Sequence, residues 1–248
     1  MLPPKQELIQ FLGSDDFFLW EYYGEGVLGK ILAWIFGSRI KVLMRFLRKV
    51  QAKPIMILDV GCGPMFISYA LVGNLTGEYV GVDIMSTDRL RHYRDAMRNV
   101  GVETVEVVRA SAESLPFRNE IFDAALSLDV LEHLRKPREA ATEIYRAVKD
   151  GGMAVISLPL ENRFQKLSRM GFILMKAKGD YIPAGAAKHV PITRTPEYHY
   201  VGDVQSYDGM AKMLRGLFSS LYTRYTPIGF HASININAVH IFRKKQLI

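Results

Sequence analysis

The amino-acid sequence predicts an α/β fold built on a mostly parallel β-sheet. From Pro54 to Pro159, short apolar runs alternate with segments of helical periodicity. This alternation requires crossover connections, which place successive strands parallel in one sheet with helices on both faces. Two later strand-like runs have no room for a helix between them, so they must pair antiparallel. A chain of 248 residues is long enough for one such domain with a lid and too short for two.

The individual elements follow from the period of the apolar residues. Apolar runs bounded by turn residues predict strands at 55–60, 78–83, 105–108, 122–128 and 153–158. Helical periodicity predicts helices at 65–73, 87–99 and 137–149, the last of them ended by Asp150-Gly151-Gly152. Residues 160–202 break the alternation. After them the pattern predicts a helix at 204–217 and strands at 222–226 and 238–242.

Cysteine usage and the first residues bear on the compartment. The single cysteine, Cys62, excludes an internal disulfide, which suits a reducing cytoplasm. The first residues show no basic segment followed by an apolar core, so a secretory signal is not expected. No cluster of potential ligands has metal-binding spacing, so no metal site is expected. The predicted location is cytoplasmic, and association with a membrane stays open.

The positive charge of the chain is concentrated in two segments. The net charge is +7, but residues 27–50 carry six basic residues and no acid, and residues 162–180 are also basic and rich in apolar residues. Segment 27–50 has a polar stripe at Lys30, Gly37, Lys41, Arg45 and Arg48, which predicts an amphipathic helix. One interpretation is a helix that caps the sheet. The other is peripheral contact of both segments with a membrane surface or a lipid-like molecule, which the local charge favours over nucleic acid.

A glycine turn follows the first predicted strand. Gly61-Cys62-Gly63 lies beyond the carboxyl end of that strand, where parallel sheets bind ligands. Glycine permits a tight turn and a close approach of the ligand to the backbone, and the next helix presents free N–H groups to a carboxylate. Asp83 ends the second strand, about 20 residues further on, a spacing that suits a carboxylate accepting hydrogen bonds from ribose hydroxyls. The turn and Asp83 therefore predict a nucleoside-binding site.

The same turn argues against a dinucleotide. A dinucleotide site needs a third small residue three positions after Gly63, so that helix and strand pack closely, and Phe66 stands there. A strand-to-helix turn without a ligand is the other reading of the glycines alone.

Several motifs in register resemble one protein family. Ile57-Leu58-Asp59-Val60-Gly61-Cys62-Gly63-Pro64 is similar to motif I of class I S-adenosylmethionine-dependent methyltransferases, and Gly81-Val82-Asp83-Ile84 to their acidic second-strand motif. Residues 110–117, 121–123, 127–134 and 149–152 resemble further blocks of the ubiquinone/menaquinone-biosynthesis-like branch, methyltransferase type 11. The resemblance covers roughly residues 54–159. It implies a Rossmann-like seven-stranded sheet of order 3-2-1-4-5-7-6 with the last strand antiparallel.

The resemblance also implies a site and a domain plan. The cofactor would be S-adenosyl-L-methionine, contacted by Asp59, Gly61, Cys62, Gly63, Asp83, Ile84, Ser111, Ala112, Leu128 and Asp129. Asp59 and the glycines would face the methionine moiety, Asp83 the ribose, and Ile84, Ser111 and Ala112 the adenine, while 128–129 close the site beneath the methyl group. Residues 1–50 would form an N-terminal helical lid on a methyltransferase domain at 51–248, in which 160–202 is a substrate-cap insertion.

Two positions depart from the family pattern. The family usually has aspartate where this chain has Ser111, which puts the bond to the adenine amino group in doubt. Met65 stands where a third glycine is common, and its side chain would either narrow the cofactor entrance or pack on the next helix. These two residues support one alternative, a cofactor-binding protein without catalysis.

Methyl transfer needs a general base only if the acceptor must lose a proton. The candidates are His133 near the end of the fourth strand and His199 in the late insertion. His189 and Asp203 are further candidates in the same part of the chain. A structural role for His133 is the competing interpretation. Asp129-Val130-Leu131-Glu132 differs from the Asn-Pro-Pro-Tyr-like pattern of enzymes that methylate adenine or glutamine amino groups. The predicted function is methyl transfer to a small or lipid-like acceptor; RNA or protein methylation is the alternative within enzymes.

Overall fold

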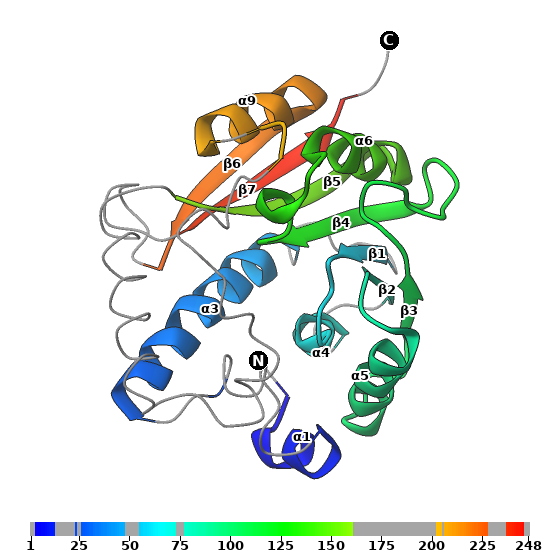
Figure 1. The fold of residues 1–248 in the computed structure, drawn as a ribbon, viewed down its shortest axis with the longest axis vertical. Helices are drawn as coiled ribbons and strands as arrows, with labels where there is room; N and C mark the ends of the chain where they lie inside the picture. The colour runs from blue at the N-terminus through cyan, green and yellow to red at the C-terminus, as the bar shows by residue number, and fades with distance from the viewer. Residues whose placement is uncertain are drawn as a thin grey trace.

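The computed structural model contains one seven-stranded sheet with helices on both faces (Figure 1). The structure describes residues 3–12, 23, 26–47, 55–72, 77–160, 202–204, 206–227 and 237–245. The strands are β1 Ile55–Val60, β2 Gly77–Asp83, β3 Val105–Arg109, β4 Phe122–Leu128, β5 Val148–Pro159, β6 Phe218–Thr226 and β7 Asn237–Lys244. Their order is β3-β2-β1-β4-β5-β7-β6. Strand β7 runs antiparallel to both neighbours, while β1 to β5 pair parallel, which confirms the predicted sheet.

The helices divide between the two faces of the sheet. In the described part of the chain they are α1 Lys5–Leu12, α3 Gly26–Leu47, α4 Phe66–Val72, α5 Thr87–Asn99, α6 Pro137–Ala147 and α9 Tyr207–Leu217, with a 3-10 turn, η1, at Leu131–His133. One core cluster joins the sheet to α1, α3, α4 and α5, and the second joins it to α6 and α9. The central strands are buried on both faces, as the continuous apolar runs predict.

The end of the third predicted helix differs from the sequence prediction. Helix α6 ends at Ala147, and Val148 already pairs with Phe122 as the first residue of β5. Val148 is β-branched and fully buried, so it packs better in a strand than as the last turn of a helix. Gly151, with φ of 71°, therefore serves an irregularity within β5 and does not stop the helix.

Strand β6 also begins earlier than the expected residue 222. It starts at Phe218, directly after α9, because Phe218 is buried against Tyr145 and Phe242, with ring centroids 5.4 and 5.7 Å apart. A register shift between Ser220 and Tyr222 then interrupts the pairing with β7.

The long helix α3, Gly26–Leu47, begins one residue before the predicted segment 27–50 and covers most of it. Its described buried residues are Arg39, Ile40, Leu43 and Met44, which face the core beside α4. Among the described residues, no helix is both long and apolar enough to cross a membrane. The basic segment 162–180 and nearly all of the insertion 160–202 lie outside the described residues.

Candidate cofactor and active site

The glycine turn bends from β1 toward the end of β2. The N–H groups of Gly61 and Cys62 both donate to the carbonyl of Val82, at 2.7 and 3.1 Å. Gly61 and Gly63 have φ of 74° and 52°, the left-handed region that glycine adopts without strain. A Cβ on Gly61 would lie 2.3 Å from Val130 Cγ2, so no side chain fits at this point. The turn is thus a bare stretch of backbone at the carboxyl edge of the sheet.

Asp83 connects the end of β2 to this turn. Its Oδ2 accepts a hydrogen bond from the Gly63 N–H at 3.1 Å, and its Oδ1 accepts one from the Met85 N–H at 3.0 Å. A carboxylate has about four acceptor positions, so each oxygen retains one for a ligand. The next side chain, Ile84, is 71% exposed, unusual for a residue of this size and suited to an apolar ring laid against it.

The side chains of Cys62 and Met65 lie in the core and not in the site. Met65 is fully buried, and its φ of 58° lies in the left-handed region. Glycine adopts this region without strain, which explains why glycine is common at this position. The Met65 side chain therefore packs under the turn and does not narrow a cofactor entrance. Cys62 is buried against Gly81, and burial raises the pKa of its thiol well above the usual value. Cys62 can therefore contact a ligand through its backbone but not through its side chain.

Asp59 is a buried carboxyl group below the turn. It accepts a hydrogen bond from the Tyr79 hydroxyl of β2, and its side chain is almost inaccessible. Burial raises the pKa of Asp59 to about 7, with a smaller contribution from the negative charge of Asp83. An ionised carboxylate is costly to bury unless a positive charge lies beside it. The position of Asp59 beneath the turn therefore fits its predicted partner, the ammonium group of an amino acid.

This titration predicts a pH-dependent affinity for S-adenosylhomocysteine. With a pKa of about 7, the ionised fraction of Asp59 grows about tenfold between about pH 6 and about pH 8. If the carboxylate receives the ammonium group, affinity measured by calorimetry rises by about the same factor over this range. Asp59→Asn should abolish the rise, because an amide does not titrate. A pH profile identical in the two proteins contradicts the prediction.

The same shift affects stability in the opposite sense. Because the folded-state pKa of Asp59 exceeds its unfolded value, its contribution is fully present below pH 3.8 and is lost as pH rises to about 7. Above that pH, Asp59→Asn is therefore expected to be at least as stable as the wild type in urea unfolding, although it binds the ligand more weakly. This combination separates a ligand-binding role from a structural one.

The loop after β3 carries the predicted adenine contacts. Ser111 is exposed, and its Oγ accepts a hydrogen bond from the Glu113 N–H at 3.2 Å, while Ala112 is buried. The Ala110 N–H donates to the Asp83 carbonyl at 3.1 Å, which brings the start of this loop to the end of β2. The predicted ribose and adenine contacts therefore lie on adjacent chain segments.

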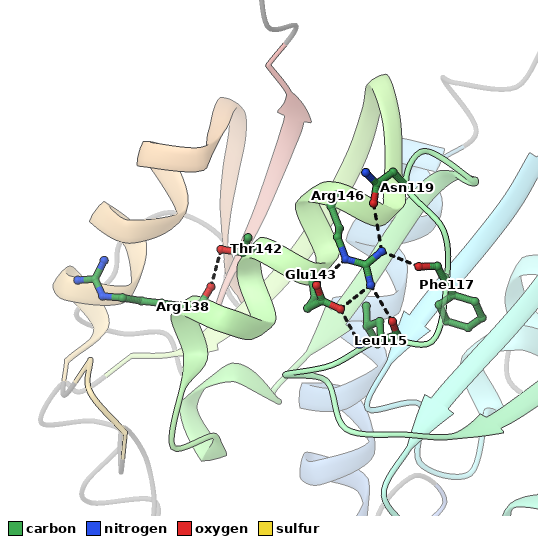
Figure 2. A network of polar contacts seen from close by, with 7 residues as sticks. All are labelled: Leu115, Phe117, Asn119, Arg138, Thr142, Glu143 and Arg146. Carbon is green, nitrogen blue, oxygen red and sulfur yellow. Dashed lines mark hydrogen bonds and ion pairs between the residues drawn. The ribbon is translucent and has the colours of Figure 1, made fainter.

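Arg146 of α6 holds the far end of this loop (Figure 2). Its guanidinium donates to the carbonyls of Leu115 and Phe117, at 2.7 and 2.5 Å. It also forms a bidentate ion pair with the Glu143 carboxylate. Glu143 in turn accepts the Leu115 N–H at 2.7 Å, and the guanidinium holds the pKa of Glu143 below its usual value. One arginine thus fixes the backbone that follows Ser111 and Ala112.

Replacing Arg146 by alanine is expected to lower the free energy of unfolding by about 2–3 kcal/mol, because several acceptors lose a charged donor. The loosened loop should also weaken ligand binding. Arg138→Ala is the control on the same helix: this arginine is exposed, and its Nε lies 3.6 Å from Asp203, so we expect a cost below about 0.5 kcal/mol. Equal losses in the two variants, measured by urea unfolding, would count against the role of Arg146.

Asp129 lies at the end of β4 and connects three other elements. Its carboxylate pairs with Arg39 of α3 and accepts hydrogen bonds from the Ser157 hydroxyl of β5 and, at 2.7 Å, from the Asn237 amide of β7. Asp129 has φ of 57°, so its backbone turns sharply after Leu128. Its oxygens are thus largely occupied by the protein. Asp129 therefore fixes the floor of the site more readily than it serves as a base.

The histidine candidates have different outcomes. His133 ends η1, three residues after the valine that packs on Gly61, and its Nε2 lies 3.8 Å from Glu132 Oε1. Its side chain is partly exposed, so a role as base stays a prediction. His199 and His189 lie outside the described residues. Asp203 is described: its N–H donates to the Arg135 carbonyl at 3.0 Å, so the end of the insertion returns beside η1.

Sequence reasoning missed several residues that shape this site. They are Arg39, Tyr79, Val130, Arg146, Ser157 and Asn237. Only Arg39 left a usable signal, because it is the one basic residue of α3 that lies off the predicted polar stripe. The partners of the others lie far away in the sequence and meet only in the folded sheet.

The fold and this site have the features of class I methyltransferases. The order β3-β2-β1-β4-β5-β7-β6 with antiparallel β7, the glycine turn and the second-strand carboxylate are these features. Residues 58–156, about two fifths of the chain, match the family model described as "Methyltransferase domain". The domain implies S-adenosylmethionine as the cofactor.

Curated relatives match this same region. An uncharacterized methyltransferase of Mycobacterium sp. (strain JLS) is 39% identical over 101 residues, 41% of this chain and 37% of the relative. The 2-methyl-6-phytyl-1,4-hydroquinone methyltransferase 1 of Oryza sativa subsp. japonica is 29% identical over 108 residues, 44% of this chain and 32% of the relative. The matched part of this chain thus spans about a third of the length of these proteins.

Solved structures agree with the fold over most of the chain. A SAM-dependent methyltransferase of Methanosarcina mazei has a TM-score of 0.55 and 20% identity, covering 81% of this chain and 97% of its own. The [4+2]-cyclase SpnF has a TM-score of 0.62 and 18% identity, covering 91% of this chain and 85% of its own. At these identities the comparison shows the fold alone.

The residues present fit S-adenosylmethionine. A side chain at Gly61 would collide with Val130, so the turn exposes backbone only at this position, and Asp83 keeps acceptor capacity beside it. Ile84 is an exposed apolar surface next to that carboxylate. Backbone, carboxylate and apolar side chain correspond to the amino-acid, ribose and adenine parts of the cofactor.

Proposed function

We propose that this protein transfers a methyl group from S-adenosylmethionine to a small, lipid-like acceptor. The observation that carries the proposal is the hydrogen bond from the Gly63 N–H to Asp83 Oδ2, because it joins the bare turn and the ribose-binding carboxylate in one site. Neither feature alone specifies the cofactor. Held together at the carboxyl edge of β1 and β2, they suit its amino-acid part and its ribose.

The sulfonium of the bound cofactor supplies an electrophilic methyl group, and its positive charge is relieved during transfer. The protein's contribution is then mainly to hold the acceptor in line with that methyl group. Leu128 and Asp129 end β4 next to the turn, and the bonds of Asp129 to α3, β5 and β7 keep this surface in place. We propose the partly exposed His133 as the group that receives a proton, if the acceptor must lose one.

The lipid-like acceptor is supported by two kinds of observation. The basic segments 27–50 and 162–180 are also rich in apolar residues, a combination that suits an apolar molecule with an anionic group. In addition, the rice relative is named for a hydroquinone that carries a phytyl chain. The described structure offers no comparable argument for an RNA or protein acceptor.

A methyl-transfer assay tests this proposal. Full-length protein is incubated with methyl-labelled S-adenosylmethionine and, separately, with lipid, RNA and protein fractions of a cell extract. We expect label in the solvent-extractable lipid fraction, and none when Asp83→Ala replaces the wild type. Label confined to RNA or protein would overturn the acceptor class. Tight cofactor binding with no transfer to any fraction would identify a binding protein without catalysis.

A further inference from the structure

The exposed side of α3 is a basic stripe that contains a tryptophan. Its described exposed residues are Lys30, Trp34, Lys41 and Arg45, and we call this set the α3 stripe. With 3.6 residues per turn, the four positions fall within an arc of about 60° and extend about 22 Å along the helix. Three cations and one large aromatic residue thus occupy one narrow face.

The opposite side of the same helix is fixed to the domain. Arg39 projects about 150° from the centre of the α3 stripe and pairs with Asp129, and Leu43 is fully buried in the core. In Figure 1, α3 begins away from the sheet and ends beside it, along one side of the molecule. The orientation of the α3 stripe toward solvent therefore follows from contacts on the inner face.

The charge of the α3 stripe is not balanced within its own helix. Residues 26–47 contain no acidic residue, and within the described part of the chain no ion pair involves Lys30, Lys41 or Arg45. Trp34 is 51% exposed. Contact with water is unfavourable for its apolar ring, and a partner surface that covered the ring would remove this cost. Cations with an interfacial aromatic residue are complementary to anionic lipid headgroups above an apolar layer.

We propose that the α3 stripe binds the surface of an anionic membrane. The helix lies along the membrane and does not cross it: the cations contact lipid phosphates and carboxylates, and Trp34 enters the headgroup region. Because Arg39 fastens the helix to Asp129 at the end of β4, binding brings the carboxyl edge of the sheet close to the membrane. This inference goes beyond methyl transfer and does not depend on it.

Vesicle co-sedimentation of the full chain tests the proposal. We expect binding to phosphatidylcholine vesicles that contain phosphatidylserine, weak binding without it, and release at high salt. Each basic residue near such a surface contributes to the affinity for the membrane. The triple variant Lys30→Glu/Lys41→Glu/Arg45→Glu should therefore bind vesicles at least about tenfold more weakly. The control Arg91→Glu/Arg118→Glu/Lys212→Glu makes the same charge change at exposed positions elsewhere, and it should bind nearly as the wild type does.

Trp34 gives a second readout that does not require the triple variant to fold. The chain has two tryptophans, so Trp20→Phe leaves Trp34 as the only one. Its fluorescence should shift to the blue and become protected from acrylamide only with anionic vesicles. The proposal is overturned by an unchanged Trp34 signal, by equal losses in the two triple variants, or by a stripe that binds RNA in preference to vesicles. Methyl-transfer activity in detergent, measured separately, keeps a failure here distinct from a failure of the enzyme proposal.

Discussion

Replacing Asp83 by alanine is expected to weaken binding of S-adenosylhomocysteine by about 100-fold or more. Each hydrogen bond between the carboxylate and a ribose hydroxyl is worth about 1.5–3 kcal/mol, and two are lost together. The Gly63 N–H also loses its acceptor, so the turn is held less firmly. Calorimetry with purified protein gives the affinity directly.

Two further variants make this result specific. Asp83→Asn keeps one acceptor oxygen, so its affinity should lie between those of the wild type and Asp83→Ala. Asp95→Asn changes an exposed aspartate of α5 that pairs with Arg94, and it should bind the ligand normally. If Asp83→Ala is folded by circular dichroism and binds within about threefold of the wild type, the assignment of the ribose site is wrong.

The largest expected effect on stability is at Asp129. Asp129→Ala removes the carboxylate that pairs with the buried Arg39 guanidinium and, at the same time, the acceptor of Ser157 and Asn237. Breaking a buried ion pair by removing one of its members costs about 3–5 kcal/mol. For a domain of this size we expect the melting temperature to fall by on the order of 10 °C.

A double-mutant cycle isolates the ion pair from the other bonds. Arg39→Met removes the charge but keeps the apolar part of the side chain, and it leaves Asp129 two donors, so its cost should be smaller. Once Arg39 is methionine, Asp129→Ala should cost less than in the wild type by at least about 1 kcal/mol. Additive losses would show that the Arg39–Asp129 pair does not fasten α3 to the end of β4.

Much of the fold was readable from local patterns. The strand at 55–60, the helix at 87–99 and the strand at 122–128 have the predicted bounds, because apolar period and turn residues agree there. The misplaced end of α6 shows where this fails. Asp150-Gly151-Gly152 carries the local signal of a helix end, but the pairing of Val148 with Phe122 is a contact between distant residues and determines the structure.

In the candidate site, too, contacts between neighbouring strands were predictable from the sequence, and contacts between distant segments were not. The turn and Asp83 lie on consecutive strands, so one motif with its spacing predicts that they meet, and the Gly63–Asp83 hydrogen bond places them together. Asp129 was predicted as a cofactor contact, yet its bonds to Arg39, Ser157 and Asn237 depend on the order of β4, β5 and β7 and on the position of α3. Such contacts between distant segments leave no periodic trace.

The fold alone does not determine the reaction. The [4+2]-cyclase SpnF shares the architecture with a TM-score of 0.62, and the structure of a SAM-dependent methyltransferase shares it with a TM-score of 0.55. Function therefore has to be argued from the site. In this protein the carboxylate of Asp83 and the bare turn beside it are the features that suit the cofactor.

A crystal structure of the protein with S-adenosylhomocysteine tests this claim most directly. The account predicts that both ribose hydroxyls donate to the Asp83 carboxylate, that the amino-acid end lies over Gly61 and Gly63, and that Ile84 covers the adenine. A ligand bound elsewhere, or one whose sugar points away from Asp83, would contradict it.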